Sequence, residues 1–543
     1  MKPLPKKSTI SNASLKRSLS LIVAVFGFLL YAQTISYTFV LDDTSAITQN
    51  HIVQEGFRGI GTLIHTSYRY GYWAQKDEIF RPLSLILFAI EWQFFPDSAA
   101  AFHLLNILLY SLTGFLLFHV LARLLKDNLL VAFIATLLFI THPVHTEVVA
   151  YIKCGDEILS FLFFLITLNF LLDFIKSNSQ ARLTYAAITF FLALLAKETA
   201  MTFVLIIPIT IFFFAKHDRS QLIKVIAALT VAILPYLLLR YFALGGIVNT
   251  KQIAGVDNII ALAPDYASRA ATAIYVLGKY LVTAVLPIHL SIDYSASEIT
   301  IIKPSDIRFI IPCIVFTSLL TYAFSRFRNR DLFAFAILLF CISIAIVSNL
   351  FIVIGTVMAD RLLYIPSLGI CMAVAMLLFK LFNPVIKPKE VPVTLRDFIK
   401  INRKTIAIAA IIIGLFSLKT ISRNPVWRDN NSLYITGVED APNSSRNHYL
   451  YALYLLDNVA IPEQDPSRRN QFFEETINEF KTSLTLYPAD FKAFERHQII
   501  LKKQDKQILL ETYKMIAITY RHQGDTANTN LFADKANAIE ASK

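Results

Sequence analysis

The chain has 543 residues, of which 55% are hydrophobic, 13% are aromatic and only 17% are charged, and its mean hydropathy is +0.54. Soluble domains of this length do not reach such values, so the composition excludes a soluble enzyme and predicts an all-α, multi-pass membrane protein. The net charge of +12 does not indicate a nucleic-acid partner, because Lys and Arg lie in short clusters between apolar runs, as the positive-inside rule expects.

The N-terminus, residues 1–18, is basic and polar, and the apolar run after it is long enough for a retained signal anchor. Its basic end is expected in the cytoplasm. Because a span needs about 17 to 25 residues, we predict about eleven helical spans in a membrane domain over residues 19–421. They are placed near 19–37, 101–122, 129–141, 157–175, 183–196, 199–215, 221–239, 306–324, 332–350, 362–381 and 405–421.

This assignment puts the basic connections on the side of the N-terminus. They hold Arg123 and Lys126, then Lys176 and Arg182, then Lys216, Arg219 and Lys224, then Arg326, Arg328 and Arg330, and a basic segment from Lys380 to Lys404. Two apolar stretches, 79–96 and 265–287, would reverse every later loop if either were counted alone as a span. We therefore interpret both as interfacial or re-entrant helices, within outer loops at 38–100 and 240–305.

Residues 422–543 are polar and, by the parity of the spans, lie outside with the first loop. Three stretches of this tail show helical periodicity with spacings similar to tetratricopeptide repeats, although a generic helical bundle is the plain alternative. Repeat tails of this kind bind a peptide or a partner protein.

Polar residues inside or beside a membrane are costly and are therefore functional candidates. Most of them fall on the predicted outer face. The candidates are Asp42 and Asp43; Arg81; His103 and Asn106; His142, His145 and Glu147; Asp156 and Glu157; Lys197 and Glu198; and Asp360 and Arg361. Some have structural readings too: Asp43 or Asp156 can cap a helix, Lys197 and Glu198 can form an ion pair, and Arg361 can extend toward the headgroups.

Such residues suit the transfer of a sugar carried on a polyprenyl phosphate. The phosphate is already a good leaving group, whereas the incoming hydroxyl needs a base, for which a carboxylate such as Asp42, Asp43 or Glu147 is suited. Charge that develops on the phosphate needs a cation, Arg or Lys. Alternatively, Asp42 and Asp43 share a divalent metal such as Mg²⁺ or Mn²⁺ with His142, His145 or Glu147. The sequence leaves this choice open.

Ordered motifs now give a resemblance. An acidic pair in the first outer loop is followed by FRPL, FHLLN, HPVHTEVVA, LAKE, LSIDYS, DRLLYIPS and RNPVW, and then by repeat-like helices. This order resembles the transmembrane and tetratricopeptide-repeat-containing O-mannosyltransferases and their bacterial relatives, over residues 30–435.

The resemblance implies a GT-C-type glycosyltransferase that inverts the anomeric centre. It also implies a polyprenyl-phosphate donor carrying a mannose-like hexose, and an extracytoplasmic acceptor such as a protein hydroxyl. The catalytic or metal-binding acids would map onto Asp42 and Asp43. Relatives often carry Gly-Arg where this chain has Lys153, Cys154 and Gly155, so an arginine contact is missing unless Lys153 substitutes for it.

Two other functions remain open at this stage. An O-antigen-ligase-like transferase would use a late loop rich in Arg and His, whereas residues 240–305 offer only Arg240, Arg269 and His289. A scaffold or transporter with a partner-binding tail would place its ionisable residues near mid-span. The short repeat array favours a bacterial cytoplasmic membrane over the endoplasmic reticulum.

Overall fold

A computed structural model of the chain describes residues 7–126, 128–246, 253–295, 297–382, 394–487 and 503–541. Every regular secondary-structure element in these ranges is a helix. The central bundle contains α1 (Lys7–Tyr31), α6 (Ala99–Leu124), α7 (Leu129–Thr141), α9 (Gly155–Ser177), α10 (Gln180–Ala196), α11 (Phe203–Phe214), α12 (Arg219–Leu244), α14 (Ile307–Phe327), α15 (Leu332–Ala345), α16 (Ser367–Phe382) and α18 (Arg403–Arg423). Each predicted span therefore corresponds to one bundle helix, and the all-α fold class is confirmed.

Length and hydropathy divide these helices into two groups. Within the described ranges, 6 helices are long and apolar enough to cross a membrane, or up to 7 if α7 and the short helices after it, bent by 51°, form one span. The shorter apolar helices include α10, α15 and α16, which have 17, 14 and 16 residues. The chain is a multi-pass membrane protein, and its span number of about eleven stays a prediction.

Side-chain caps explain where several helices begin. Asn128 accepts a hydrogen bond from the backbone of Val131 at the start of α7, and Asp331 does the same for the first turn of α15. Asp218 and Gln221 form a reciprocal capping box at the start of α12. Each cap satisfies backbone N–H groups that a helix start leaves without partners. α9 ends at Asn178, whose φ of 51° is left-handed.

The core of the bundle is built from α6, α7, α9 and α16. α9 packs against α10 and α6, and α16 packs against α7 and α15. α14 lies at the margin of the bundle, since only 6% of its most apolar 18-residue stretch is buried. Its exposed Ile and Phe side chains suit contact with lipid.

The remaining elements connect the bundle helices. The first outer loop contains η1 (Ala32–Ser36), η2 (Thr44–Thr48), α2 (His51–Gln54), η3 (Gly56–Arg58), α3 (Ile60–Leu63), α4 (Tyr70–Trp73) and α5 (Pro82–Phe94). Later connecting elements are η4 (Pro143–His145), α8 (Thr146–Ala150), η5 (Ile152–Cys154), η6 (Glu198–Thr202), η7 (Ile259–Leu262), α13 (Tyr266–Val285), η8 (Asp360–Leu363), α17 (Leu395–Ile401) and η9 (Asn424–Trp427). The stretches 79–96 and 265–287 contain α5 and α13; their interfacial placement stays a prediction.

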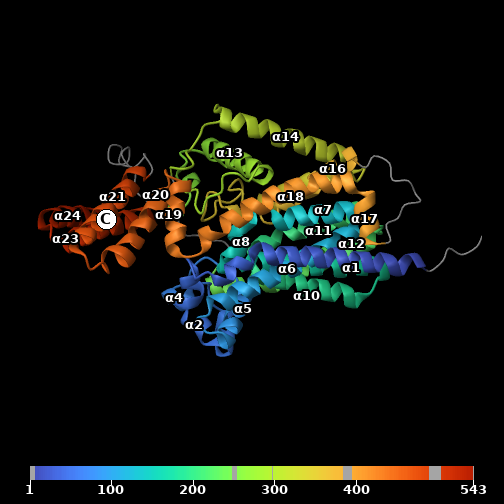
Figure 1. The fold of residues 1–543 in the computed structure, drawn as a ribbon, viewed down its shortest axis with the longest axis horizontal. Coiled ribbons are helices and arrows are strands. Elements are labelled where there is room, and N and C mark those ends of the chain that lie inside the picture. The colour runs from blue at the N-terminus through green and yellow to red at the C-terminus, as the bar shows by residue number, and fades with distance from the viewer. Residues whose placement is uncertain are drawn as a thin grey trace, which may run out of the picture.

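The tail contains α19 (Asn430–Asp440), α20 (Ser445–Tyr454), η10 (Leu455–Ala460), α21 (Pro466–Leu486), α23 (Lys503–Gln523) and α24 (Thr526–Ala541). α20 packs on α21, and α23 packs on α24. These helical pairs agree with the predicted hairpins, and their assignment as tetratricopeptide repeats stays a prediction. The tail and α2 to α4 lie at one end of the bundle, opposite α17 (Figure 1). Part of the Lys380–Lys404 segment and residues 488–502 fall outside the described residues.

Candidate active site

The two acids of the first outer loop occupy different environments. Asp43 is fully buried, and its carboxylate accepts hydrogen bonds from the backbone N–H groups of Val40 at 3.0 Å and Lys153 at 2.8 Å. The Asp42 side chain is 34% exposed, and its Oδ2 lies 3.2 Å from Nη2 of Arg69 and 3.7 Å from Nζ of Lys153. Asp43 therefore fastens the loop to η5, whereas Asp42 presents a carboxylate to solvent between two cations.

The backbone around Asp42 is held from both sides. Leu41, directly before it, has a φ of 51°, a left-handed conformation that is unfavourable for a leucine. The N–H of Leu41 donates to Oδ1 of Asn430 at 3.0 Å, and the N–H of Asp42 donates to the hydroxyl of Tyr151 at 2.9 Å. The ring of Tyr151 stacks on Trp427, with centroids 5.0 Å apart. The start of the tail thus fixes the turn that exposes Asp42.

The same surroundings separate the pKa values of the two acids. Burial raises the pKa of Asp43 to about 7, and the negative charge of Asp42 also raises it. Burial alone would raise the pKa of Asp42, but the charges of Lys153 and Arg69 outweigh it and hold the pKa well below its usual range. Asp42 is therefore ionised at neutral pH.

Residues 147–157 connect the site, because their polar side chains contact residues of several outer elements. Glu147 is buried; its Oε2 accepts from the backbone N–H of Arg361 at 2.8 Å, and its Oε1 pairs with the guanidinium of the same residue. The Arg361 side chain remains 25% exposed. Its positive charge also lowers the pKa of Asp42. Four cations, Lys153, Arg69, Arg446 and Arg361, thus act on one exposed carboxylate.

A second, buried cluster joins α5, α9 and η6. Arg81 contacts Asp156 at 2.5 Å and Glu198 at 2.8 Å through its Nε atom. Lys197 contacts Asp156 at 2.9 Å and Glu157 at 2.8 Å. The five side chains contribute two positive and three negative charges. Buried ions are tolerated when they are paired in this way. This network links the start of α9, directly after η5, to Arg81 before α5 and to Glu198 of η6.

The remaining predicted residues lie deeper. His142 contacts the carbonyl oxygen of Ala284 at 2.9 Å. His145 contacts the hydroxyls of Tyr110 and Ser367, both at 2.9 Å. Both histidines are buried and tie the bundle to neighbouring helices. Asn106 donates to the carbonyl of Ile152 at 3.3 Å. His103 is buried beside Tyr37, with the two ring centres 6.1 Å apart.

Asp360 directly precedes Arg361 in the sequence, and its side chain is buried. Its Oδ1 accepts a hydrogen bond from the hydroxyl of Tyr294 at 2.8 Å. Burial raises the pKa of Asp360 to about 7, and the charge of Glu147 also raises it. Among the described residues, the sequence interpretation missed Arg69, Tyr151 and Tyr294. No sequence motif marks Arg69. Its side chain reaches Asp42, 27 residues earlier in the chain, only through the tertiary structure.

The predicted metal site has a poor donor set. Within the described ranges, no three His, Cys, Asp or Glu side chains are grouped so that they could hold a metal ion. The carboxylate of Asp43 accepts two backbone hydrogen bonds, and the neighbours of Asp42 are an ammonium and a guanidinium. Cations beside Asp42 oppose the binding of another cation. The surroundings of Asp42 and Asp43 therefore do not fit a divalent metal.

No family model matches the chain. Among characterised sequences, protein O-mannosyl-transferase F38B6.6 of Caenorhabditis elegans is 26% identical over 452 residues, covering 81% of this chain and 60% of that protein. Protein O-mannosyl-transferase TMTC1 of Homo sapiens is 25% identical over 541 residues, covering 87% of this chain and 55% of that protein. TMTC4 of Mus musculus is 26% identical over 499 residues, covering 80% of this chain and 64% of that protein.

These relatives confirm the resemblance inferred from the ordered motifs. The chain spans less than two thirds of the length of each relative named here. Two solved structures are also similar. ArnT from Cupriavidus metallidurans bound to undecaprenyl phosphate aligns with a TM-score of 0.42 at 11% identity, over 88% of this chain and 90% of that one. The oligosaccharyltransferase AglB from Archaeoglobus fulgidus aligns with a TM-score of 0.40 at 12% identity, over 87% and 60%.

Proposed function

We propose that the chain is a membrane glycosyltransferase that moves a mannose-like hexose from a polyprenyl-phosphate donor to a hydroxyl group outside the cytosol. The observation that carries this proposal is the exposed, ionised carboxylate of Asp42, which lies 3.2 Å from Arg69 and 3.7 Å from Lys153. The similarity to protein O-mannosyl-transferases supports the choice of mannose and of a protein acceptor.

In the proposed reaction, the acceptor oxygen attacks the anomeric carbon from the face opposite the phosphate. The bond from that carbon to the phosphate oxygen breaks, and the phosphate leaves with the bonding electrons, so the anomeric centre is inverted. Asp42 takes the hydroxyl proton. A carboxylate with a lowered pKa is a weak base, but the hydroxyl proton becomes acidic as its oxygen forms the new bond.

The leaving phosphate needs positive charge but no proton. Lys153 offers a point charge and Arg361 a planar set of N–H donors, both suited to phosphate oxygens. Glu147 accepts from Arg361 through its backbone and its guanidinium, so the exposed part of that guanidinium is held in one orientation. We assign Glu147 and the network of Arg81, Asp156, Glu157, Lys197 and Glu198 as positioning residues, which hold the cations before the substrate arrives.

We assign acceptor binding to the tail. Arg446 on α20 contacts Asp257 at 2.8 Å, and its positive charge lowers the pKa of Asp42. Ser444 donates to Asp293 at 2.8 Å. The first tail helices are thus attached to the late outer loop close to the candidate site. A peptide held along the tail would reach Asp42 without leaving this end of the bundle. We place this end outside a bacterial cytoplasmic membrane, in agreement with the charge distribution.

The test is an assay of transfer with purified full-length protein. The donor is radiolabelled polyprenyl-phosphate mannose, with the glucose analogue in parallel, and the acceptor is a cell-envelope protein fraction. We expect label in protein, released by an α-mannosidase if a β-linked donor is inverted. Label in lipid or glycan alone would overturn the protein acceptor. Failure of every donor, with a folded protein, would favour the scaffold or transporter alternative.

A further inference from the structure

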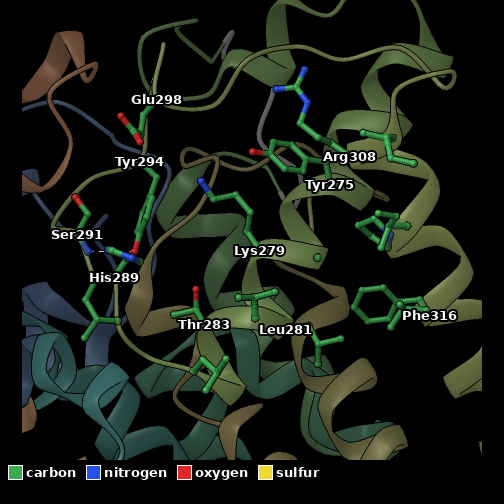
Figure 2. A pocket seen from close by; sticks show the side chains of 18 of the residues that line it. Tyr275, Lys279, Leu281, Thr283, His289, Ser291, Tyr294, Glu298, Arg308 and Phe316 are labelled. Carbon is green, nitrogen blue, oxygen red and sulfur yellow. Dashed lines mark hydrogen bonds between the residues drawn. The ribbon is translucent and has the colours of Figure 1, made fainter.

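A cavity of about 640 Å³ lies between α13 and α14, and Asp42 does not line it. One wall is apolar and includes Leu281 of α13 and Ile311, Val315 and Phe316 of α14. Figure 2 shows Lys279, Tyr275, Tyr294 and Glu298 gathered toward the opposite part of the cavity. Because α14 is almost wholly exposed along its apolar length, the cavity is accessible from the lipid side. We call it the lateral groove. Its two halves match the two halves of a membrane lipid.

The charges of the groove are specific. Nζ of Lys279 lies 5.9 Å from the ring centre of Tyr275 and 5.8 Å from that of Tyr294. Oε2 of Glu298 is buried, and none of the described residues gives it a hydrogen bond. Two other charged residues line the groove. Arg308 pairs with Asp306 at 2.7 Å and lies over the ring of Tyr275, 5.5 Å from its centre, and Asp440 pairs with Arg423. Among the described lining residues, Lys279 is the cation that no ion pair neutralises, and Oε2 of Glu298 is the carboxylate oxygen without a donor.

We propose that the lateral groove binds a zwitterionic glycerophospholipid with a phosphoethanolamine headgroup. The phosphate lies against the ammonium of Lys279, the primary ammonium of the lipid donates to Oε2 of Glu298, and an acyl chain follows the apolar wall of α14. A buried acceptor without a donor is costly, and a charged N–H donor relieves that cost.

Charge and hydrogen bonding separate this lipid from the alternatives. An anionic lipid, or a polyprenyl phosphate, would place its negative charge against Lys279 but would bring no ammonium to the carboxylate of Glu298, whose charge would stay without a partner from the ligand. A choline headgroup carries the positive charge but has no N–H to donate to Oε2. The ethanolamine headgroup supplies both the charge and the donor.

The lateral groove also reaches toward the candidate site. Tyr294 lines the groove, and its hydroxyl donates to Asp360, the neighbour of Arg361, at 2.8 Å. A headgroup packed on Tyr294 would restrain the segment that carries Arg361. This inference does not depend on the proposed transferase activity, because lipid binding is measured without any sugar donor.

The test is native mass spectrometry of the purified full-length protein, titrated with dioleoyl forms of phosphatidylethanolamine, phosphatidylcholine and phosphatidylglycerol, and with undecaprenyl phosphate. We expect wild type to prefer phosphatidylethanolamine over the other two phospholipids by about tenfold, the value of one charged hydrogen bond. Glu298→Met should remove the preference over phosphatidylcholine and improve binding of phosphatidylglycerol. Lys279→Gln should weaken the binding of all three phospholipids.

Lys303→Gln is the matched control, since Lys303 is exposed in the same outer segment and does not line the groove; it should bind lipids as wild type does. Each variant is first checked for a single species by size-exclusion chromatography. If either Glu298→Met or Lys279→Gln fails to fold, the lipid preference of the variant that folds decides the test. Equal binding of the three phospholipids by wild type would overturn the proposal. So would unchanged selectivity in a folded Glu298→Met protein, or displacement of phosphatidylethanolamine by equimolar undecaprenyl phosphate.

Discussion

The ammonium of Lys153 lies 3.7 Å from the carboxylate of Asp42. The backbone N–H of the same lysine donates to Asp43 at 2.8 Å. One residue of η5 therefore fixes the buried acid through its main chain and tunes the exposed acid through its side chain. This arrangement accounts for the different behaviour that we expect of two adjacent aspartates.

Replacing Lys153 by methionine should shift the acidic limb of the pH–rate profile to higher pH. With the ammonium present, the pKa of Asp42 is held below its usual range, so the base stays ionised well into acid. Without the ammonium of Lys153, fewer positive charges counteract the effect of burial, and the pKa of Asp42 rises. We also expect kcat/KM to fall about 10²-fold through loss of the phosphate contact. Lys153→Arg should keep the wild-type limb, and Lys216→Met, at an exposed site, should change neither. An unshifted limb in Lys153→Met would contradict this account.

Asp43 should make stability depend on pH. Its pKa is raised from 3.8 to about 7 in the folded protein. The folded state therefore binds the proton more tightly than the unfolded state, and this contribution to stability is full below pH 3.8 and is lost as the pH rises through about 7. Asp43→Asn has no proton to lose. Relative to wild type, its melting temperature should rise between about pH 4 and pH 7. Parallel melting curves at all pH values would show that Asp43 does not titrate there.

Arg361 and Glu147 call for a double-variant cycle. Arg361→Met leaves Glu147 buried without its cation, so both stability and transfer should fall. The double variant Glu147→Leu/Arg361→Met removes that penalty and should recover most of the stability. If Arg361 contacts the donor phosphate, kcat/KM should remain about 10²-fold below wild type in the double variant. Recovery of activity together with stability would reduce Arg361 to a structural role.

The buried network should matter first for folding. Arg81→Met leaves Asp156 and Glu198 without one of their cations, and breaking a buried pair from one side costs about 3–5 kcal/mol. Thermal unfolding in detergent measures the loss, and Arg58→Met, at an exposed position of the same loop, serves as the control. A change of less than about 1 kcal/mol would place the cluster in the weak class of solvent-exposed pairs.

Chelation should leave transfer unchanged. The charged side chains next to Asp42 are the cations Arg69 and Lys153, which cannot bind a metal ion. The described residues contain no group of three His, Cys, Asp or Glu side chains that could hold one. After dialysis against EDTA, we expect wild-type kcat/KM within twofold (about 0.4 kcal/mol) of the untreated value. Loss of activity that is restored by Mg²⁺ or Mn²⁺ would revive the metal alternative for Asp42 and Asp43.

Sequence reasoning located the helices well because the apolar runs set them. α10 and α15 are short, but Lys197 follows the end of α10 and Asp331 caps the start of α15. The sequence also drew attention to Asp42 and Asp43 but did not decide which of the two carries the chemistry. What separates them is tertiary: the left-handed turn at Leu41, the hydrogen bond from Lys153, and the cation Arg69. Pairings such as Arg81 with Glu198, 117 residues apart, carry no mark in a single sequence.

The most direct test of the central claim compares Asp42→Asn with Asp97→Asn, an exposed acid of the same outer loop. Both changes remove one negative charge with little change in volume, and Asn tolerates the left-handed backbone at position 97, where φ is 55°. If Asp42 is the base, sugar transfer by folded Asp42→Asn protein should fall about 10³-fold, with donor binding retained and Asp97→Asn as active as wild type. Equal transfer by all three proteins would contradict the account.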